Sequence, residues 1–298
     1  MKFEEAKVEE WHQAKGLRGI YAAIERTAKI CTGLQPSNDR ETEKKFVQRL
    51  VDSDPQHGRP LEFGTVYLTL PWWKVFTALK FLFNKFSKSR KFYYVTTNYR
   101  VIVENGWYDA LKYLSNDGEN TPTENHAVRR TLHWTISRGI ADEFRTHVSI
   151  SSMMQSTRYC NFGKDRFGNG ITFIFPQWAY GMIPQNVYQE NLHRTDGGGW
   201  AELARKYDER FVRYENTLKA EEEFYLWATT NEKEELQLKP QFARGPLGLD
   251  LKTEFVQCAF EDDWKHFFYL RVEKGAHPDA VYIAQWAQRV LGIFERKY

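Results

Sequence analysis

Apolar residues recur along the chain in two patterns, one typical of strands and one typical of helices. Alternation, or a stretch rich in Tyr, Val and Thr, predicts strands at 62–70, 92–103, 131–136 and 171–175. Helical spacing or helix-favouring composition predicts helices at 75–86, 107–114, 140–148, 200–234, 262–270 and 278–294. Because these elements are mixed without the regular alternation of a parallel sheet, the sequence predicts an α+β fold.

The other segments are mostly polar. Residues 1–57 favour helices, whereas 149–155 carries turn-tolerant residues. Asp196–Gly199 is expected to be a flexible joint, because it lacks the neighbouring strand and the spacing of a phosphate-binding loop. The run Glu221–Glu223 is expected on a solvated helix face, since no histidine lies at metal-ligand spacing nearby. We therefore predict no metal site.

Composition and charge narrow the class of protein. The 298 residues carry 42 basic and 39 acidic side chains, a net charge of +3, with no basic block of the kind that binds nucleic acid or membranes. Three cysteines fit neither a zinc site nor a disulfide framework, which favours a reducing compartment. The longest apolar stretch, 75–86, is too short to span a bilayer. We expect a soluble cytoplasmic protein with neither a nucleic-acid nor a membrane partner.

Three arginines stand in distinctive contexts. Arg158 lies in Ser156–Tyr159, Arg244 in Ala243–Leu249, and Arg271 ends the segment that begins at His266. A guanidinium group remains charged and bonds two phosphate or base oxygens at once. Such side chains suit a nucleotide monophosphate, although a single arginine is more often a surface or salt-bridge residue.

Taken in order, these segments resemble the flavin-dependent thymidylate synthases. That family carries an Arg-His-Arg triplet followed by a Ser and a Ser-x-Arg-Tyr, and later Ala-Arg-x-x-Leu-Pro-Leu and Phe-x-x-Leu-Arg segments. The chain matches them around His147, Arg158, Arg244 and Arg271, although Gly248 replaces the family's proline. Two more segments, Ala276–Asp279 and Leu61–Thr65, are similar to further family motifs.

The resemblance implies a fold and an activity. It implies one elaborated domain over 1–298, with a mixed or antiparallel sheet flanked by helices, a helical N-terminal extension at 1–57 and an enlarged insertion at 72–131. It implies a homotetramer whose active sites form between subunits. The reaction implied is methylation of dUMP to dTMP, in which methylenetetrahydrofolate supplies the carbon and FAD takes hydride from NADPH, so the protein mainly binds and orients.

The resemblance also assigns roles to residues. Arg271 would hold and polarise the pyrimidine ring, which makes it the candidate catalytic residue. The substrate-binding candidates that accompany it are Glu143, Ser156, Thr157, Arg158 and Arg244. The candidate polar contacts to FAD are His147, Ser151 and His266.

The departures from the family pattern fall largely on the flavin side. Thr146 and Val148 stand where the family has its two arginines, Met154 replaces a polar or acidic residue, and Phe63 replaces a histidine. Each lost charged hydrogen bond removes about 1.5 to 3 kcal/mol, which predicts weaker FAD binding. Arg145 is adjacent, but on a helix one position turns a side chain by about 100 degrees.

Three hypotheses remain open from the sequence. The first is thymidylate synthesis with altered flavin contacts. The second keeps the nucleotide site but changes the outcome, as C5 hydroxymethylation or methylation of another pyrimidine nucleotide. The third is a non-catalytic homologue that binds a nucleotide as a regulatory or structural subunit.

Overall fold

The computed structural model describes residues 1–168, 170–193, 196–273 and 275–294, whose strands form three sheets. The central sheet is antiparallel and four-stranded, in the order β2-β6-β9-β7; β3-β5-β4 forms a second antiparallel sheet, and β1 pairs with β8 in parallel. The strands are β1 (Lys2–Glu4), β2 (Lys7–Trp11), β3 (Thr65–Thr69), β4 (Lys88–Arg90), β5 (Tyr94–Asn98), β6 (Arg129–Ser137), β7 (Ser151–Met154), β8 (Thr172–Ile174) and β9 (Lys252–Phe260).

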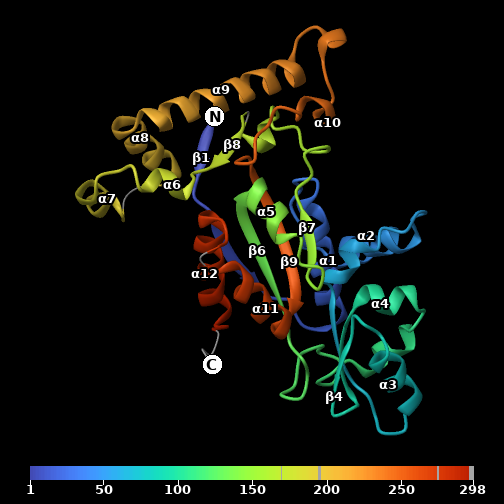
Figure 1. Ribbon diagram of the computed structural model, residues 1–298. Coiled ribbons are helices and arrows are strands. Elements are labelled where there is room, and N and C mark those ends of the chain that lie inside the picture. The colour runs from blue at the N-terminus through green and yellow to red at the C-terminus, as the bar shows by residue number, and fades with distance from the viewer. Residues whose placement is uncertain (169, 194–195, 274, 295–298) are drawn as a thin grey trace.

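Helices surround these sheets. In Figure 1 the long helix α9 crosses one end of the molecule, α3 and α4 lie at the opposite end, and the central sheet stands between them. The α-helices are α1 (Gly16–Ile30), α2 (Arg40–Asp52), α3 (Val75–Leu82), α4 (Tyr99–Glu104), α5 (Arg138–Phe144), α6 (Gln177–Tyr180), α7 (Gln185–Asn191), α8 (Gly197–Tyr207), α9 (Glu209–Thr230), α10 (Pro240–Ala243), α11 (Glu261–Arg271) and α12 (Pro278–Leu291). Short 3-10 helices are η1 (Arg59–Phe63), η2 (Tyr108–Tyr113), η3 (Asp165–Phe167) and η4 (Glu234–Leu236). The α+β prediction is confirmed.

Both faces of the central sheet are covered, as strand β9 shows. Phe255 and Ala259 point to one face, where they join Trp134 of β6 and the apolar sides of α5, α11 and α12 in a buried core. Val256 and Cys258 point to the other face and meet apolar side chains from α1 and η1. Successive residues of a strand face opposite sides, so burial on both sides gives β9 its nearly unbroken run of buried residues.

The N-terminal segment differs from the prediction that 1–57 is helical. Helices α1 and α2 lie there, but β1 and β2 precede them. Strand β2 pairs antiparallel with β6, from Lys7 opposite Thr135 to Trp11 opposite Thr131. Pairing with a strand more than a hundred residues away overrides local helix propensity. The domain boundaries expected from the sequence stay predictions.

Three further predictions were wrong, one in the second sheet and two beside the central sheet. The stretch 92–103 is strand only through β5, because the Asn98 side chain accepts a hydrogen bond from the Val101 backbone N–H at 3.1 Å and begins α4. The expected helix 140–148 ends as α5 at Phe144, and Val148 is 98% exposed. The expected turn at 149–155 contains β7, which pairs with β9.

Predictions near α8 and α9 were also wrong. Asp196 does not begin a flexible joint: its Oδ1 accepts from the Gly199 N–H at 3.0 Å and caps α8. Gly197 lies so near the chain that an added Cβ would come within 2.6 Å of the Glu4 carbonyl carbon. In the run expected on a solvated face, Glu222 is buried and accepts from the Ile171 N–H at 2.8 Å.

Candidate functional site

A cavity of about 800 Å³ lies along the chain that joins α5 to β7 and continues past β7. Its far wall is provided by Arg59 from η1 and by Arg244, which follows α10. The residues that line it are Arg59, Arg138, Asp142, Arg145, Thr146, His147, Val148, Ile150, Ser152, Met153, Met154, Gln155, Ser156, Thr157, Arg158 and Arg244. Most of them come from one continuous segment, 138–158, so local chain geometry shapes the cavity.

The cavity is strongly cationic. Five arginines line it against one carboxylate, Asp142, which gives a formal charge of five minus one, or +4. Asp142 Oδ1 already lies 3.2 Å from Arg145 Nη2. Guanidinium groups gathered around so little negative charge favour an anionic ligand, and planar N–H donors suit a phosphate.

Arg138 is the most confined of these cations. Its guanidinium is half-buried, and burial lowers its pKa, although the nearby Asp142 carboxylate opposes that shift. Its Nη1 atom is buried and has no hydrogen-bond partner among the residues that the structure describes. A buried donor without an acceptor is costly, so an anion in the cavity would relieve a penalty of about 1–3 kcal/mol.

The turn after β7 places the predicted phosphate-binding residues. The Ser156 N–H donates to the Cys31 carbonyl at 3.0 Å, and the Ser156 hydroxyl accepts from the Arg158 N–H at 3.2 Å. Thr157 is buried, and its hydroxyl accepts from Arg244 Nη1 at 2.6 Å. This bond joins two segments 87 residues apart, so the fold brings the two motifs into one site.

Arg271 lies beside the cavity and closes the end of α5. Its Nε donates to His147 Nε2 at 2.9 Å, its Nη1 to Glu143 Oε2 at 3.2 Å, and its Nη2 to the Glu143 carbonyl at 2.8 Å. A fourth bond runs from Nη2 to the Thr146 hydroxyl at 3.2 Å. Thr146 stands where the family has an arginine, and its hydroxyl thus accepts a hydrogen bond from Arg271.

His147 joins this cluster to the cavity. Burial, with the nearby charges of Arg271 and His266, lowers its pKa to about 4. It is therefore neutral at pH 7, and its Nε2 is free to accept from Arg271. Its ring lies against Phe267, with centroids 4.7 Å apart.

The structure brings together some of the predicted site residues and separates others. Five of them line the cavity: His147, Ser156, Thr157, Arg158 and Arg244. Glu143 and Arg271 pair with each other next to it. Neither Ser151 nor the exposed His266 is among the lining residues.

Sequence reasoning missed Arg59 and Arg138 as site residues. Arg138 directly follows a predicted strand, and its position before the signature segment was the one available signal. Nothing in the sequence around Arg59 connects it with a segment about a hundred residues later. Arg145 also lines the cavity, beside Thr146, although its backbone is still helical and its N–H donates to the Ala141 carbonyl at 2.9 Å.

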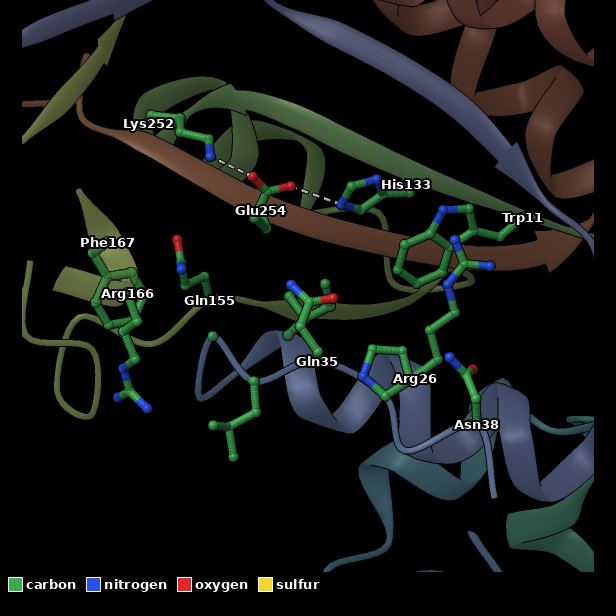
Figure 2. A pocket seen from close by; sticks show the side chains of 14 residues that line it. Trp11, Arg26, Gln35, Asn38, His133, Gln155, Arg166, Phe167, Lys252 and Glu254 are labelled. Carbon is green, nitrogen blue, oxygen red and sulfur yellow. Dashed lines mark ion pairs between the residues drawn. The ribbon is translucent and has the colours of Figure 1, made fainter. Parts of the chain in front are cut away.

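A second cavity, of about 580 Å³, lies on the α1 side of the central sheet (Figure 2). Figure 2 shows Glu254 between Lys252 and His133, with Nζ to Oε1 at 2.5 Å and Nε2 to Oε2 at 2.7 Å. Arg26 lies over the Trp11 ring, 3.5 Å from its centroid. Because much of its charge is paired within the wall, this cavity is a weaker candidate for a phosphate than the first.

The part of the chain that the structure describes holds neither a metal-ligand cluster nor a helix that could span a membrane. No group of three or more His, Cys, Asp or Glu side chains there could hold a metal ion. Among the same residues, no helix combines the length and the apolar character needed to cross a bilayer.

Comparisons with known proteins place this chain in a family. The family model described as thymidylate synthase complementing protein matches residues 77–297. The resemblance at Leu61–Thr65 therefore lies outside the matched range. No curated protein sequence matches the chain.

Two solved structures are similar to this chain. Thymidylate synthase X from Helicobacter pylori, with FAD and dUMP, is 11% identical, with a TM-score of 0.38 over 96% of this chain and 92% of that one. The UMP/dUMP methylase PolB from Streptomyces cacaoi, bound with 5-Br dUMP, is 12% identical, with a TM-score of 0.43 over 98% and 92%.

Proposed function

The chain belongs to the thymidylate synthase complementing protein family, and from this premise we propose that it methylates dUMP reductively to dTMP. Methylenetetrahydrofolate is the proposed carbon donor, with FAD and NADPH supplying the electrons. The observation that carries the proposal is the cationic cavity, in which five arginines face one carboxylate. A nucleotide monophosphate brings the dianion that such a cavity favours.

Arg158 and Arg244 are the proposed phosphate ligands. The bond from Arg244 Nη1 to the Thr157 hydroxyl fixes the guanidinium of Arg244. The remaining N–H donors of Arg244 are therefore held in one orientation. Arg158 is exposed and lies over the Tyr159 ring, 5.5 Å from the centroid, so it has room to move onto a ligand. Ser156 and Glu143 are proposed to contact phosphate and sugar, with Thr157 holding Arg244 in place.

Arg271 is the proposed residue that polarises the pyrimidine ring. Four of its five N–H donors bond to Glu143, Thr146 and His147. In the proposal, an oxygen of the ring takes over the donor that Thr146 holds at 3.2 Å, while the bond to His147 keeps the guanidinium oriented. A positive guanidinium at a ring oxygen stabilises negative charge that develops as C5 reacts.

The residues present fit an anionic cofactor such as FAD. Arg138 Nη1, which has no hydrogen-bond partner among the described residues, offers a donor, and Arg145 lines the same cavity in place of the arginines that the family has on either side of its histidine. His147 is a neutral polar contact, and Ser151 and His266 are further candidates. When bound, FAD supplies the two-electron chemistry that methyl formation requires. A cytoplasmic homotetramer is the proposed working form.

The reaction is tested with purified protein, dUMP, methylenetetrahydrofolate, FAD and NADPH. We expect flavin absorbance bands on the protein after FAD is added and the excess removed, and dTMP as the product by mass spectrometry. Hydroxymethyl-dUMP, or turnover of UMP alone, would replace the proposed reaction with another on the same site. Neither flavin binding nor product would leave a non-catalytic nucleotide-binding protein.

Variants locate the substrate. Arg244→Gln and Arg158→Gln should each weaken dUMP binding roughly 10- to 100-fold in calorimetry, because a charged hydrogen bond contributes about 1.5–3 kcal/mol. Arg213→Gln is the matched control, since Arg213 is a 77% exposed arginine of α9 paired with Glu209. Equal dUMP affinity in all three variants and the unmodified protein would mean that the nucleotide does not bind in this cavity.

A further inference from the structure

Among the residues that the structure describes, the three most exposed aromatic side chains lie on α3 and the turns on either side of it. Phe76 and Phe83 are each 82% exposed, Trp72 is 73% and Trp73 is 62% exposed, and Phe86 is 51% exposed. The rings of Trp72 and Trp73 touch, with centroids 5.8 Å apart. We call residues 72–86 the α3 patch. Large exposed aromatic groups on one short segment mark an interaction surface.

The α3 patch is the outer side of an amphipathic helix. Ala78 and Phe81 are fully buried, and the Phe81 ring packs on Trp107 at 4.8 Å. Phe76 and Phe83 are seven positions apart, so they lie on one line of the helix, turned away from Ala78 and Phe81. The inner face therefore belongs to the core of this lobe, whereas the outer face stays exposed in the part of the chain that the structure describes.

The charge around this patch is of one sign. Between residues 63 and 103 the sequence has seven lysines and arginines and no aspartate or glutamate. Lys80 lies between Phe76 and Phe83 on the outer line, and Lys85 lies over the Phe86 ring at 4.8 Å. Two of the seven pair with carboxylates outside this stretch: Lys88 with Asp262 at 3.3 Å, and Arg100 with Glu62 and Glu104, each at 2.6 Å. The patch combines protruding aromatic rings with cations that carry no acidic neighbour of their own segment.

We propose that the α3 patch binds the surface of a membrane that contains anionic phospholipids. An amphipathic helix with Trp and Phe on one side and lysines around them lies in the headgroup region, where rings enter the acyl boundary and cations meet lipid phosphates. Lysine side chains on such a face extend to the charged surface while their stems stay apolar. The proposal stands apart from the proposed reaction and revises the expectation of no membrane partner.

The charge of the α3 patch favours an anionic membrane over a second copy of the chain as its partner. In a symmetric dimer the same patch meets itself, which would bring lysines against lysines with no carboxylate between them. The aliphatic side chains on the exposed surface favour a membrane over single-stranded nucleic acid. Val75 and Leu82 share the exposed surface at 38% and 46% exposure, and aliphatic side chains offer no face on which bases stack.

The position of the patch suits a surface contact. Helix α3 lies at the end of the molecule opposite α9 and α10 (Figure 1). Docking through α3 would leave the cationic cavity, whose walls follow α5 and α10, open to its ligands.

The test is sedimentation of the full chain with vesicles. We expect binding to vesicles of phosphatidylcholine and phosphatidylserine, loss of that binding as salt is raised, and little binding to phosphatidylcholine alone. The double variant Phe76→Ala/Phe83→Ala should bind at least tenfold more weakly, and both rings are too exposed for the change to affect folding. The matched control Phe224→Ala/Trp227→Ala removes two exposed rings of α9 and should bind like the unmodified protein.

A charge variant tests the contribution of the lysines separately from that of the rings. Lys80→Gln/Lys85→Gln should weaken binding to anionic vesicles about tenfold or more, since each lysine near such a surface contributes about 1 kcal/mol. Equal binding to both kinds of vesicle would overturn the proposal, because the cations would then contribute nothing. It would also be overturned by self-association or oligonucleotide binding through the same residues without vesicle binding.

Discussion

His147 accepts the hydrogen bond from Arg271 only while its Nε2 carries no proton. Burial and the charges of Arg271 and His266 keep that atom free by lowering the pKa of His147 to about 4. The same bond fixes the side chain proposed to polarise the pyrimidine. One neutral imidazole, just after α5, is therefore bonded to the last residue of α11, 124 residues away along the chain.

The pH dependence of stability tests this link. The pKa of His147 falls from 6.5 to about 4 on folding, so between these values the unfolded chain binds the proton more tightly. This contribution to stability is complete above pH 6.5 and is lost as pH falls toward 4. Urea unfolding should therefore show a smaller loss of stability between pH 7 and pH 5 in His147→Gln than in the unmodified protein. His12→Gln, an exposed control, should keep the full loss; equal curves for all three proteins would contradict the link.

At the scale of elements, buried side chains of helices satisfy backbone groups of neighbouring segments. Glu222 of α9 accepts from the Ile171 N–H at 2.8 Å, and its neighbour Glu221 accepts from the Gly248 N–H at 2.8 Å. These bonds tie α9 to the start of β8 and to the loop before β9. The acidic run thus holds elements together, although its composition is typical of a solvated face.

Glu222→Ala should lower the free energy of unfolding by about 1–3 kcal/mol, because a buried N–H loses its acceptor. Glu223→Ala is the control from the same run, since Glu223 is exposed, and should change stability by no more than about 0.5 kcal/mol. Urea denaturation measures the free energy of unfolding of both variants. Equal losses would mean that the bond to Ile171 contributes nothing.

The elements that the sequence predicted well carry their own signals. Strand β6 shows alternation at Leu132, Trp134 and Ile136, and α12 begins at Pro278 with an apolar stripe behind it. Strands β2 and β7 lack such signals, because each is defined by the strand that it pairs with in the sheet. The same holds for the site: motifs located Arg158 and Arg244, whereas the fold alone adds Arg59 and Arg138.

At the scale of the molecule, separate hydrophobic cores support different parts of the surface. One core joins β6, β9, α5, α11 and α12, and another lies around α1, β3, α3 and α4. Phe267 belongs to the first and touches the His147 ring, while Phe81 belongs to the second. The first core thus supports the proposed nucleotide site through His147, and the second supports the α3 patch.

Two matched core substitutions test this division. Phe267 and Phe81 are both fully buried, so Phe267→Leu and Phe81→Leu should each lower the free energy of unfolding by about 1–2 kcal/mol. Only Phe267→Leu removes a ring that positions His147, and with it Arg271, so only that variant should weaken dUMP binding in calorimetry. We expect a loss of roughly tenfold, since a displaced charged hydrogen bond contributes about 1.5 kcal/mol or more. If Phe81→Leu weakened dUMP binding as much, the two cores would act as one unit and the proposed support of the site by Phe267 would be wrong.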